Sequence, residues 1–136
     1  MISYDDFAKI EIKAGKILSA EKVQNADKLL KLLVDFGFKT AVSAVSESIL
    51  PGISPDTVVI PLAPEKDIRQ IISGISQWFP EPSALVEKTC MFVTNLEPRI
   101  IRGLQSQGMI LALSTPDGKF SLLEPNNAIP IGTKAK

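Results

Sequence analysis

Two arginines lie three residues apart within residues 95–113, and their spacing predicts an anion-binding surface. Arg99 and Arg102 are two of the three arginines in the chain, and a polar Gln-Ser-Gln run follows at residues 105–107. The planar guanidinium group suits phosphate oxygens, and neutral amide and hydroxyl groups can bond to sugar and base edges without repelling a polyanion. No acidic residue occurs within residues 98–116. The residues alone are also consistent with a solvated basic loop that closes a barrel.

This basic stretch is expected to connect two buried strands. An apolar strand ends near residues 93–96, Pro98 turns the chain, and Gly103 and Gly108 allow it to start again. We therefore predict an irregular connection that gathers guanidinium and amide groups at one rim of a sheet.

The composition describes a single domain, residues 1–136, with no net charge. Fifteen basic and fifteen acidic residues cancel, so any binding of nucleic acid must come from a local patch. The chain has no histidine, which removes the usual general base and the commonest metal ligand. We therefore expect no enzyme activity, no metal site and no cofactor. Cys90 lies in an apolar run and is expected to be a buried, unreactive thiol.

The N-terminus and the apolar runs bear on localisation. The first residues, MISYDDFAK, are acidic and lack an apolar segment, so no signal peptide is visible. No apolar run approaches the length that crosses a membrane. We expect a soluble cytoplasmic protein.

Short β-prone segments separated by turn signals indicate an all-β domain with little helix. Ser3 and Asp6 have the spacing of a capping box and predict one short N-terminal helix. The expected strands are residues 9–23, 28–36, 69–75, 89–96, 108–114 and 120–123. This pattern predicts a five-stranded Greek-key barrel of the oligonucleotide-binding (OB) type, although it leaves an SH3-like barrel or a small sandwich open.

Residues 40–66 are expected to form an inserted hairpin or arm on this barrel. A Pro-Gly turn signal lies within the segment, and a β-prone Thr-Val-Val-Ile run follows it. Three acidic residues and no lysine or arginine occur within residues 40–65, so the segment is poorly suited to hold phosphates. It is either a tolerated insertion or a contact for another protein.

Three sequence blocks carry a resemblance to a known family. Residues 26–32 read ADKLLKL, residues 71–75 read IISGI, and residues 95–109 read NLEPRIIRGLQSQGM. In this order they resemble the tRNA-binding domain found at the C-terminus of many methionyl-tRNA synthetases, in free-standing tRNA-binding proteins and in endothelial-monocyte-activating polypeptide. The resemblance spans nearly the whole chain apart from about residues 40–66. It selects the OB-fold barrel with terminal extensions.

The resemblance implies non-catalytic, structure-specific tRNA binding. The chain would act as a C-terminal domain or accessory subunit of methionyl-tRNA synthetase or as a free-standing tRNA-binding protein. The residues assigned to phosphates are Lys28, Lys31, Arg99 and Arg102, and those assigned to sugar or base edges are Asn95 and Ser106. Met109 is expected either in the core or beside a splayed base. Glu97 and Ile100 depart from the family, in which these positions are often basic.

The chain termini are apolar and predict a second contact. Family members commonly form homodimers through their terminal extensions, and the corresponding candidates here are Tyr4, Phe7, Ile129 and Ile131, which would otherwise be exposed. The alternative function is that of a dimeric, peptide-binding, chaperone-like protein of the same fold. In that case the apolar ends and the arm would matter more than the arginines.

Overall fold

The computed structural model describes residues 1–38 and 65–136 of the chain. The predicted arm at 40–66 lies outside the described residues, except for its last two positions. Among the described residues, no helix is long and apolar enough to cross a membrane.

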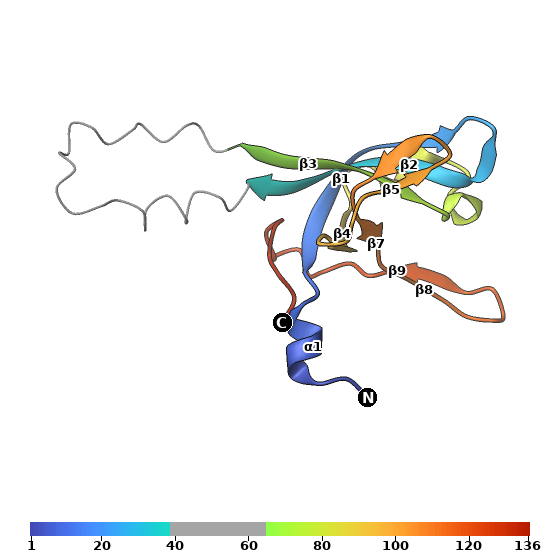
Figure 1. Cartoon of the computed structure of the whole chain (residues 1–136). Helices are drawn as coiled ribbons and strands as arrows, with labels where there is room; N and C mark the ends of the chain where they lie inside the picture. The colour runs from blue at the N-terminus through green and yellow to red at the C-terminus, as the bar shows by residue number, and fades with distance from the viewer. Residues whose placement is uncertain (39–64) are drawn as a thin grey trace, which may run out of the picture.

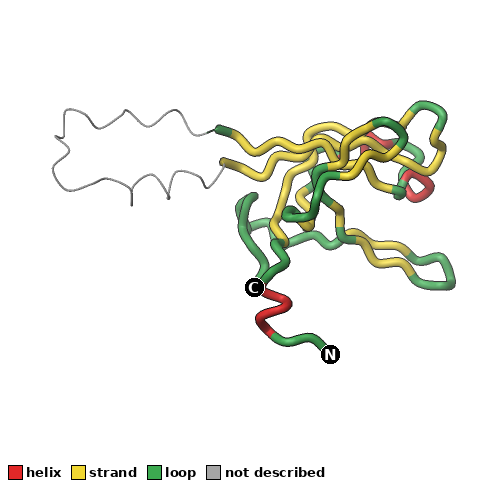
Figure 2. Tube along the Cα trace, viewed as in Figure 1, coloured by secondary structure: helices red, strands yellow, loops and turns green. Residues whose placement is uncertain are grey.

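A curled, five-stranded antiparallel sheet forms the body of the molecule (Figures 1 and 2). Its strands are β1 (Ile12–Val23), β2 (Ala26–Phe38), β3 (Lys66–Ser73), β4 (Thr89–Val93) and β7 (Met109–Ile110), in the order β3-β2-β1-β4-β7. β1 is shared, because its first half pairs with β4 and its second half pairs with β2. The prediction of an all-β, OB-type barrel is confirmed.

The short helices lie at the N-terminus and after the third strand. Helix α1 (Tyr4–Ala8) begins at the predicted capping box, in which the Ser3 hydroxyl accepts from the Asp6 amide and the Asp6 carboxylate accepts from the Ser3 amide. Two 3-10 helices, η2 (Ser76–Trp78) and η3 (Pro82–Leu85), follow β3.

The hydrophobic core follows from the alternation of residues along β2. Leu30, Leu32, Val34 and Phe36 are all buried, because every second residue of this strand faces the inside of the curl. The Phe36 ring meets the Phe92 ring edge-on, with centroids 5.3 Å apart. A Cβ on Gly15 would lie 2.6 Å from Phe36, so β1 needs glycine where it crosses this ring.

Cys90 lies in the same core, as the sequence predicts. Its side chain is fully buried, and burial raises the pKa of the thiol to about 11. The predicted burial is confirmed, and a thiol with a raised pKa holds little reactive thiolate at neutral pH.

The barrel closes through polar side chains of the segment that precedes β7. The Ile72 amide donates to the Ser106 hydroxyl (3.0 Å), and the Gln70 amide donates to the Gln107 side-chain oxygen (3.1 Å). In return, the Gln107 amide donates to the Gln70 carbonyl (2.8 Å). Gly108 comes next in the chain and packs closely against β4, because a Cβ at this position would lie 3.0 Å from the Val93 carbonyl oxygen. Ser106 and Gln107 thus supply acceptors for the backbone amides of the β3 edge.

Two small hairpins extend from the closed body. The first pairs β5 (Arg99–Ile101) with β6 (Leu104–Ser106), and the second pairs β8 (Ala112–Ser114) with β9 (Phe120–Leu122). The single strand predicted over residues 108–114 is therefore divided between the barrel and the second hairpin. Phe120 stacks on Trp78, with ring centroids 4.3 Å apart, which holds the second hairpin against η2.

The C-terminal tail runs beside the first half of β1. The Ala14 amide donates to the Thr133 carbonyl (3.0 Å), and the Ala135 amide donates to the Ile12 carbonyl (2.8 Å). Figure 1 shows that this places the C-terminus next to α1.

Candidate nucleic-acid interface

The two arginines of the basic stretch lie on the regular β5–β6 hairpin. Ile101 pairs with Leu104, so the hairpin turns through only Arg102 and Gly103, which have φ angles of 53° and 80°. Two positive φ angles give a turn whose twist matches that of the flanking strands. The predicted irregular connection is therefore corrected to a two-residue hairpin turn. Arg102 is exposed at its tip, and Arg99 is exposed at its base.

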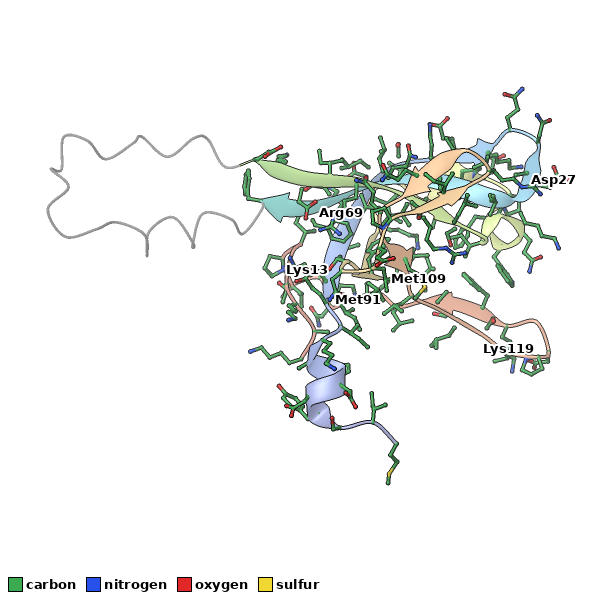
Figure 3. All side chains as sticks on the ribbon, viewed as in Figure 1. Lys13, Asp27, Arg69, Met91, Met109 and Lys119 are labelled. Carbon is green, nitrogen blue, oxygen red and sulfur yellow. The ribbon has the colours of Figure 1, made fainter. Side chains whose placement is uncertain are left out.

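A second basic site lies at the end of the β1–β2 hairpin. Val23 pairs with Ala26 across a two-residue turn, but the next pair joins Lys22 to Leu30. Residues 27–29 are therefore left without cross-strand partners and bulge outward. Lys28 lies in this bulge and is exposed, and its neighbour Asp27 marks the end of the hairpin in Figure 3.

Most cations of the described chain are paired with acids. The paired residues are Lys9, Lys13, Lys16, Lys31, Lys66, Arg69, Lys88 and Lys119. Apart from Lys134 and Lys136 in the tail, the cations without an acidic partner within the described residues are Lys22, Lys28, Arg99 and Arg102. Unpaired positive charge is thus concentrated on the β1–β2 and β5–β6 hairpins.

The two basic hairpins occupy the loops that OB-type barrels use for ligands. In such barrels, oligonucleotides bind to the face of the second and third strands and to the loops after the first and fourth strands. The β1–β2 turn is the first of these loops, and the β5–β6 hairpin lies in the second, between β4 and β7. β2 pairs with β3, and the Gln70 side chain of β3 donates to the Gln105 carbonyl of β6 (2.9 Å). Both turns lie at the same end of the barrel in Figure 1.

Lys31 and Lys22 differ from the sequence-based assignment. Lys31 lies on β2 between the two hairpins, but its ammonium group pairs with the Glu21 carboxylate at 3.4 Å. Such an exposed pair is weak, so Lys31 can still exchange its partner for a phosphate. Lys22 is not among the residues assigned to the interface from the sequence, although it lies next to the turn and has no acidic partner in the part of the chain that the structure describes. Which lysine pairs with Glu21 depends on cross-strand register, and the sequence alone does not give that register.

Ser106 and Asn95 have structural roles in place of the predicted sugar or base contacts. Ser106 is only 5% exposed, and besides accepting from Ile72 its hydroxyl donates to the Gly108 carbonyl (3.1 Å). The Asn95 oxygen accepts from the Glu11 amide (2.7 Å), and its NH₂ group donates to the Lys9 carbonyl (2.6 Å). Ser106 cannot reach RNA without opening the barrel. Asn95 is exposed, but its amide is engaged in tying the N-terminal segment to β4.

The third arginine, Arg69, is committed to the interior. Its guanidinium group pairs with Asp67 (2.9 Å), donates to the Thr94 and Gln107 carbonyls and lies 5.4 Å from the centre of the Phe36 ring. Figure 3 shows Arg69 in the body of the sheet, away from the hairpin turns. Arg69 therefore braces the closure of the barrel and leaves the surface charge to the hairpins.

Exposed apolar side chains accompany the basic hairpin. Met109 is 47% exposed on β7, so its predicted core alternative does not hold. Ile100 is 69% exposed and Leu96 is 49% exposed. Neither of these two was assigned to the interface from the sequence. Among the described residues, no group of three or more histidine, cysteine, aspartate or glutamate side chains is placed to hold a metal ion.

The family model described as "Putative tRNA binding domain" matches residues 57–134, which is more than half of the chain. The chain belongs to this tRNA-binding domain family. Its sequence resemblance is thereby confirmed, and the basic hairpin lies within the matched region.

Relatives of this tRNA-binding domain include both large and small proteins. The methionine–tRNA ligase of Enterococcus faecalis is 36% identical over 131 residues, which cover 96% of this chain but only 16% of the ligase. The MetRS-related protein of Pyrococcus horikoshii is 30% identical with a TM-score of 0.74, and the match covers 100% of this chain and 98% of that one. The chaperone CsaA of Bacillus anthracis shares the fold, with a TM-score of 0.71 at 21% identity and coverage of 100% and 99%.

Proposed function

We propose that this tRNA-binding domain holds folded tRNA through phosphate contacts from its two basic hairpins. The observation that carries the proposal is the concentration, at one end of the barrel, of cations that have no acidic partner in the described part of the chain, namely Lys22, Lys28, Arg99 and Arg102. The chain as a whole has no net charge. Cations already paired with acids are largely neutralised toward a polyanion, whereas unpaired ones attract it. Lys31 on β2 and the exposed Met109 on β7 complete the proposed contact surface, whereas the Asn95 amide is engaged with Lys9 and Glu11.

The exposed aromatic residues, Tyr4 on α1 and Phe38 at the end of β2 away from the β1–β2 turn, lie apart from the basic hairpins, which favours recognition of RNA shape and backbone over base stacking. Phe36 and Phe92 are buried in the core, and Phe120 is packed between Trp78 and Phe79. OB-type barrels that bind single strands usually stack bases on exposed aromatic side chains. A folded RNA offers phosphates and ribose hydroxyls in a fixed arrangement, which suits a surface built from cations on two rigid hairpins.

The domain would act without catalysis and alongside a synthetase. Its ligase relatives are several times longer than this chain, whereas the Pyrococcus protein has nearly the same extent. We therefore propose a cytoplasmic role either as an accessory domain or subunit of methionyl-tRNA synthetase or as a free-standing protein. In either form it would raise the local concentration of tRNA.

A homodimer would extend this binding surface. Tyr4 is 77% exposed and Ile129 is 40% exposed, while Phe7 and Ile131 are partly covered. Because the C-terminus lies next to α1, we propose that an interface at this end of the molecule would bring two basic hairpin pairs to one RNA.

The double variant R99A/R102A tests the proposed function. We expect it to bind tRNA at least tenfold more weakly in a fluorescence anisotropy titration. The slope of log affinity against log salt should change from about −3 for the wild type to between about −2 and −1 for the variant. Its thermal unfolding should match that of the wild type, since both side chains are exposed.

A matched control removes two cations that are paired with acids. Lys9 pairs with Asp6 and Lys119 pairs with Asp117, and their side chains are 79% and 81% exposed. The double variant K9A/K119A should bind tRNA like the wild type. If R99A/R102A also binds tRNA as tightly as the wild type, the proposal fails.

Exposed apolar side chains on the sheet favour the alternative, a peptide-binding, chaperone-like dimer. Leu33 on β2 is 37% exposed and Ile68 on β3 is 46% exposed. Binding of an unfolded peptide that persists in 1 M salt, together with no binding of tRNA, would support this alternative over the first proposal.

A further inference from the structure

Ile100 is the most exposed apolar side chain of the basic hairpin. It is 69% exposed in the middle of β5, where it pairs with Gln105 on β6. The neighbouring pair joins Arg99 to Ser106, and Ser106 is buried against β3. Successive residues of a strand point to opposite faces, so the face that carries Ile100 and Gln105 points away from the barrel.

The charges around Ile100 define what can cover it. Arg99 precedes it and Arg102 lies two residues beyond it at the turn, and neither is paired with an acid in the described part of the chain. Glu97 is the nearest acid in the sequence, and no other occurs before residue 117. Because successive residues of a strand face opposite sides, Arg99 emerges on the other face of β5 and Arg102 at the turn. A partner that covers Ile100 and also meets these cations carries negative charges next to a flat apolar surface. A nucleic acid has this chemistry, since its phosphates flank the faces of its bases.

We propose that Ile100 packs against the face of an unstacked nucleobase in the bound RNA while Arg102 at the turn and Arg99 on the other face of β5 hold neighbouring phosphates. This inference rests on the proposed function and adds to it an apolar contact with a base. An aliphatic side chain covers a base face by exclusion of water, without the ring overlap that an aromatic residue would provide. The site would therefore favour RNA with a splayed base, such as one in a loop, over a uniform double helix.

The presence of an exposed isoleucine at position 100 also has a purely structural explanation, which is its β propensity. β-branched residues suit strands even when they are exposed, and a three-residue strand gains from one. The second hairpin provides a matched site, because Leu113 is the middle residue of β8, is 61% exposed and also pairs with a polar residue, Ser121. Comparison of the two positions separates the binding role from the structural one.

The test compares Ile100→Thr with Leu113→Thr. Threonine retains β propensity but removes most of the apolar surface, so both variants should unfold at nearly the wild-type temperature. We expect I100T to bind tRNA about three- to tenfold more weakly than the wild type with an unchanged salt slope, because the lost contact involves no charge. L113T should bind tRNA like the wild type.

Heparin, a polyanion without bases, provides the second readout. I100T should bind heparin as tightly as the wild type does, because only the cations contribute. Equal binding of tRNA by I100T and the wild type would overturn the inference, as would a loss of heparin binding equal to the loss of tRNA binding. Either of these two outcomes for I100T leaves the proposed function intact. Absence of tRNA binding by the wild type would overturn both the proposed function and the inference about Ile100.

Discussion

The Ser106 hydroxyl lies 3.0 Å from the backbone nitrogen of Ile72 and accepts its hydrogen bond inside the closed barrel. A side chain thereby occupies the position in which a neighbouring strand would normally place a carbonyl oxygen. The hydroxyl also donates to the Gly108 carbonyl (3.1 Å), so one small group joins β3 to the segment that leads into β7. The basic hairpin ends at this residue, and its position on the barrel therefore depends on this bond.

Ser106→Ala is expected to destabilise the fold without a direct loss of RNA contacts. The substitution leaves the buried Ile72 amide without an acceptor, which costs about 1–3 kcal/mol in the free energy of unfolding. Urea denaturation measures this cost. The exposed Ser121, whose hydroxyl donates to the neighbouring Leu122 carbonyl, provides the control S121A, which should be nearly neutral. Weaker tRNA binding by S106A with an unchanged salt slope and an unchanged free energy of unfolding would instead assign Ser106 to the RNA.

The arginines are expected to separate into one structural residue and two binding residues. Arg69→Met removes an ion pair with Asp67 and leaves that carboxylate, which is 13% exposed, without its partner. We expect a loss of about 2 kcal/mol in the free energy of unfolding, measured in urea, and a tRNA salt slope close to that of the wild type. R99A/R102A should instead reduce the tRNA salt slope and leave the free energy of unfolding nearly unchanged. A large change in the salt slope for R69M would contradict the assignment of Arg69 to the interior.

Local patterns in the sequence were sufficient to predict much of the fold. The capping box at Ser3 involves residues three apart, and the alternation along β2 reports directly which side chains face the core. The sequence blocks that resemble the tRNA-binding domain family selected the OB-type barrel from the alternatives that the pattern left open.

The roles of individual residues were harder to predict, because they depend on distant parts of the chain. Asn95 bonds to Glu11 and Lys9, which are 84 and 86 positions away, and Ser106 bonds to Ile72. In the sequence, a polar residue in a basic loop resembles a binding residue, because its hydrogen-bond partners become known only from the folded structure. The phosphate assignments of Lys28, Arg99 and Arg102 stay predictions, supported by their exposure and by the lack of acidic partners among residues 1–38 and 65–136.

Thr94→Val is expected to weaken the fold in a pH-dependent manner. The Thr94 hydroxyl donates to the Glu11 carboxylate (2.6 Å), and this bond, with a smaller contribution from Lys13, lowers the pKa of Glu11 below its ordinary value of 4.5. A carboxyl group with a lowered pKa adds stability above its unfolded pKa and loses it as the pH falls through its folded pKa. The variant should therefore be less stable than the wild type by about 1 kcal/mol at pH 7.

The difference between T94V and the wild type should shrink as the pH falls below 4.5, because Glu11 becomes protonated in both proteins. Urea denaturation at pH 7 and at pH 3 measures this change. A difference that is the same at both pH values would show that the Thr94 hydroxyl acts independently of the Glu11 charge.

Gly108→Ala is expected to disturb the junction between the basic hairpin and β7. An added Cβ would lie 3.0 Å from the Val93 carbonyl oxygen and 3.2 Å from the Ile71 side chain. The side chain can shift, but the carbonyl belongs to β4, so the closing segment must move outward. We expect a loss of about 1–3 kcal/mol in the free energy of unfolding, together with weaker tRNA binding because the hairpin is displaced. Gly74→Ala is the control, since the nearest atom to its added Cβ is 3.9 Å away. Equal stability of G108A and G74A would show that β4 and the closing segment are less tightly packed than their distances imply.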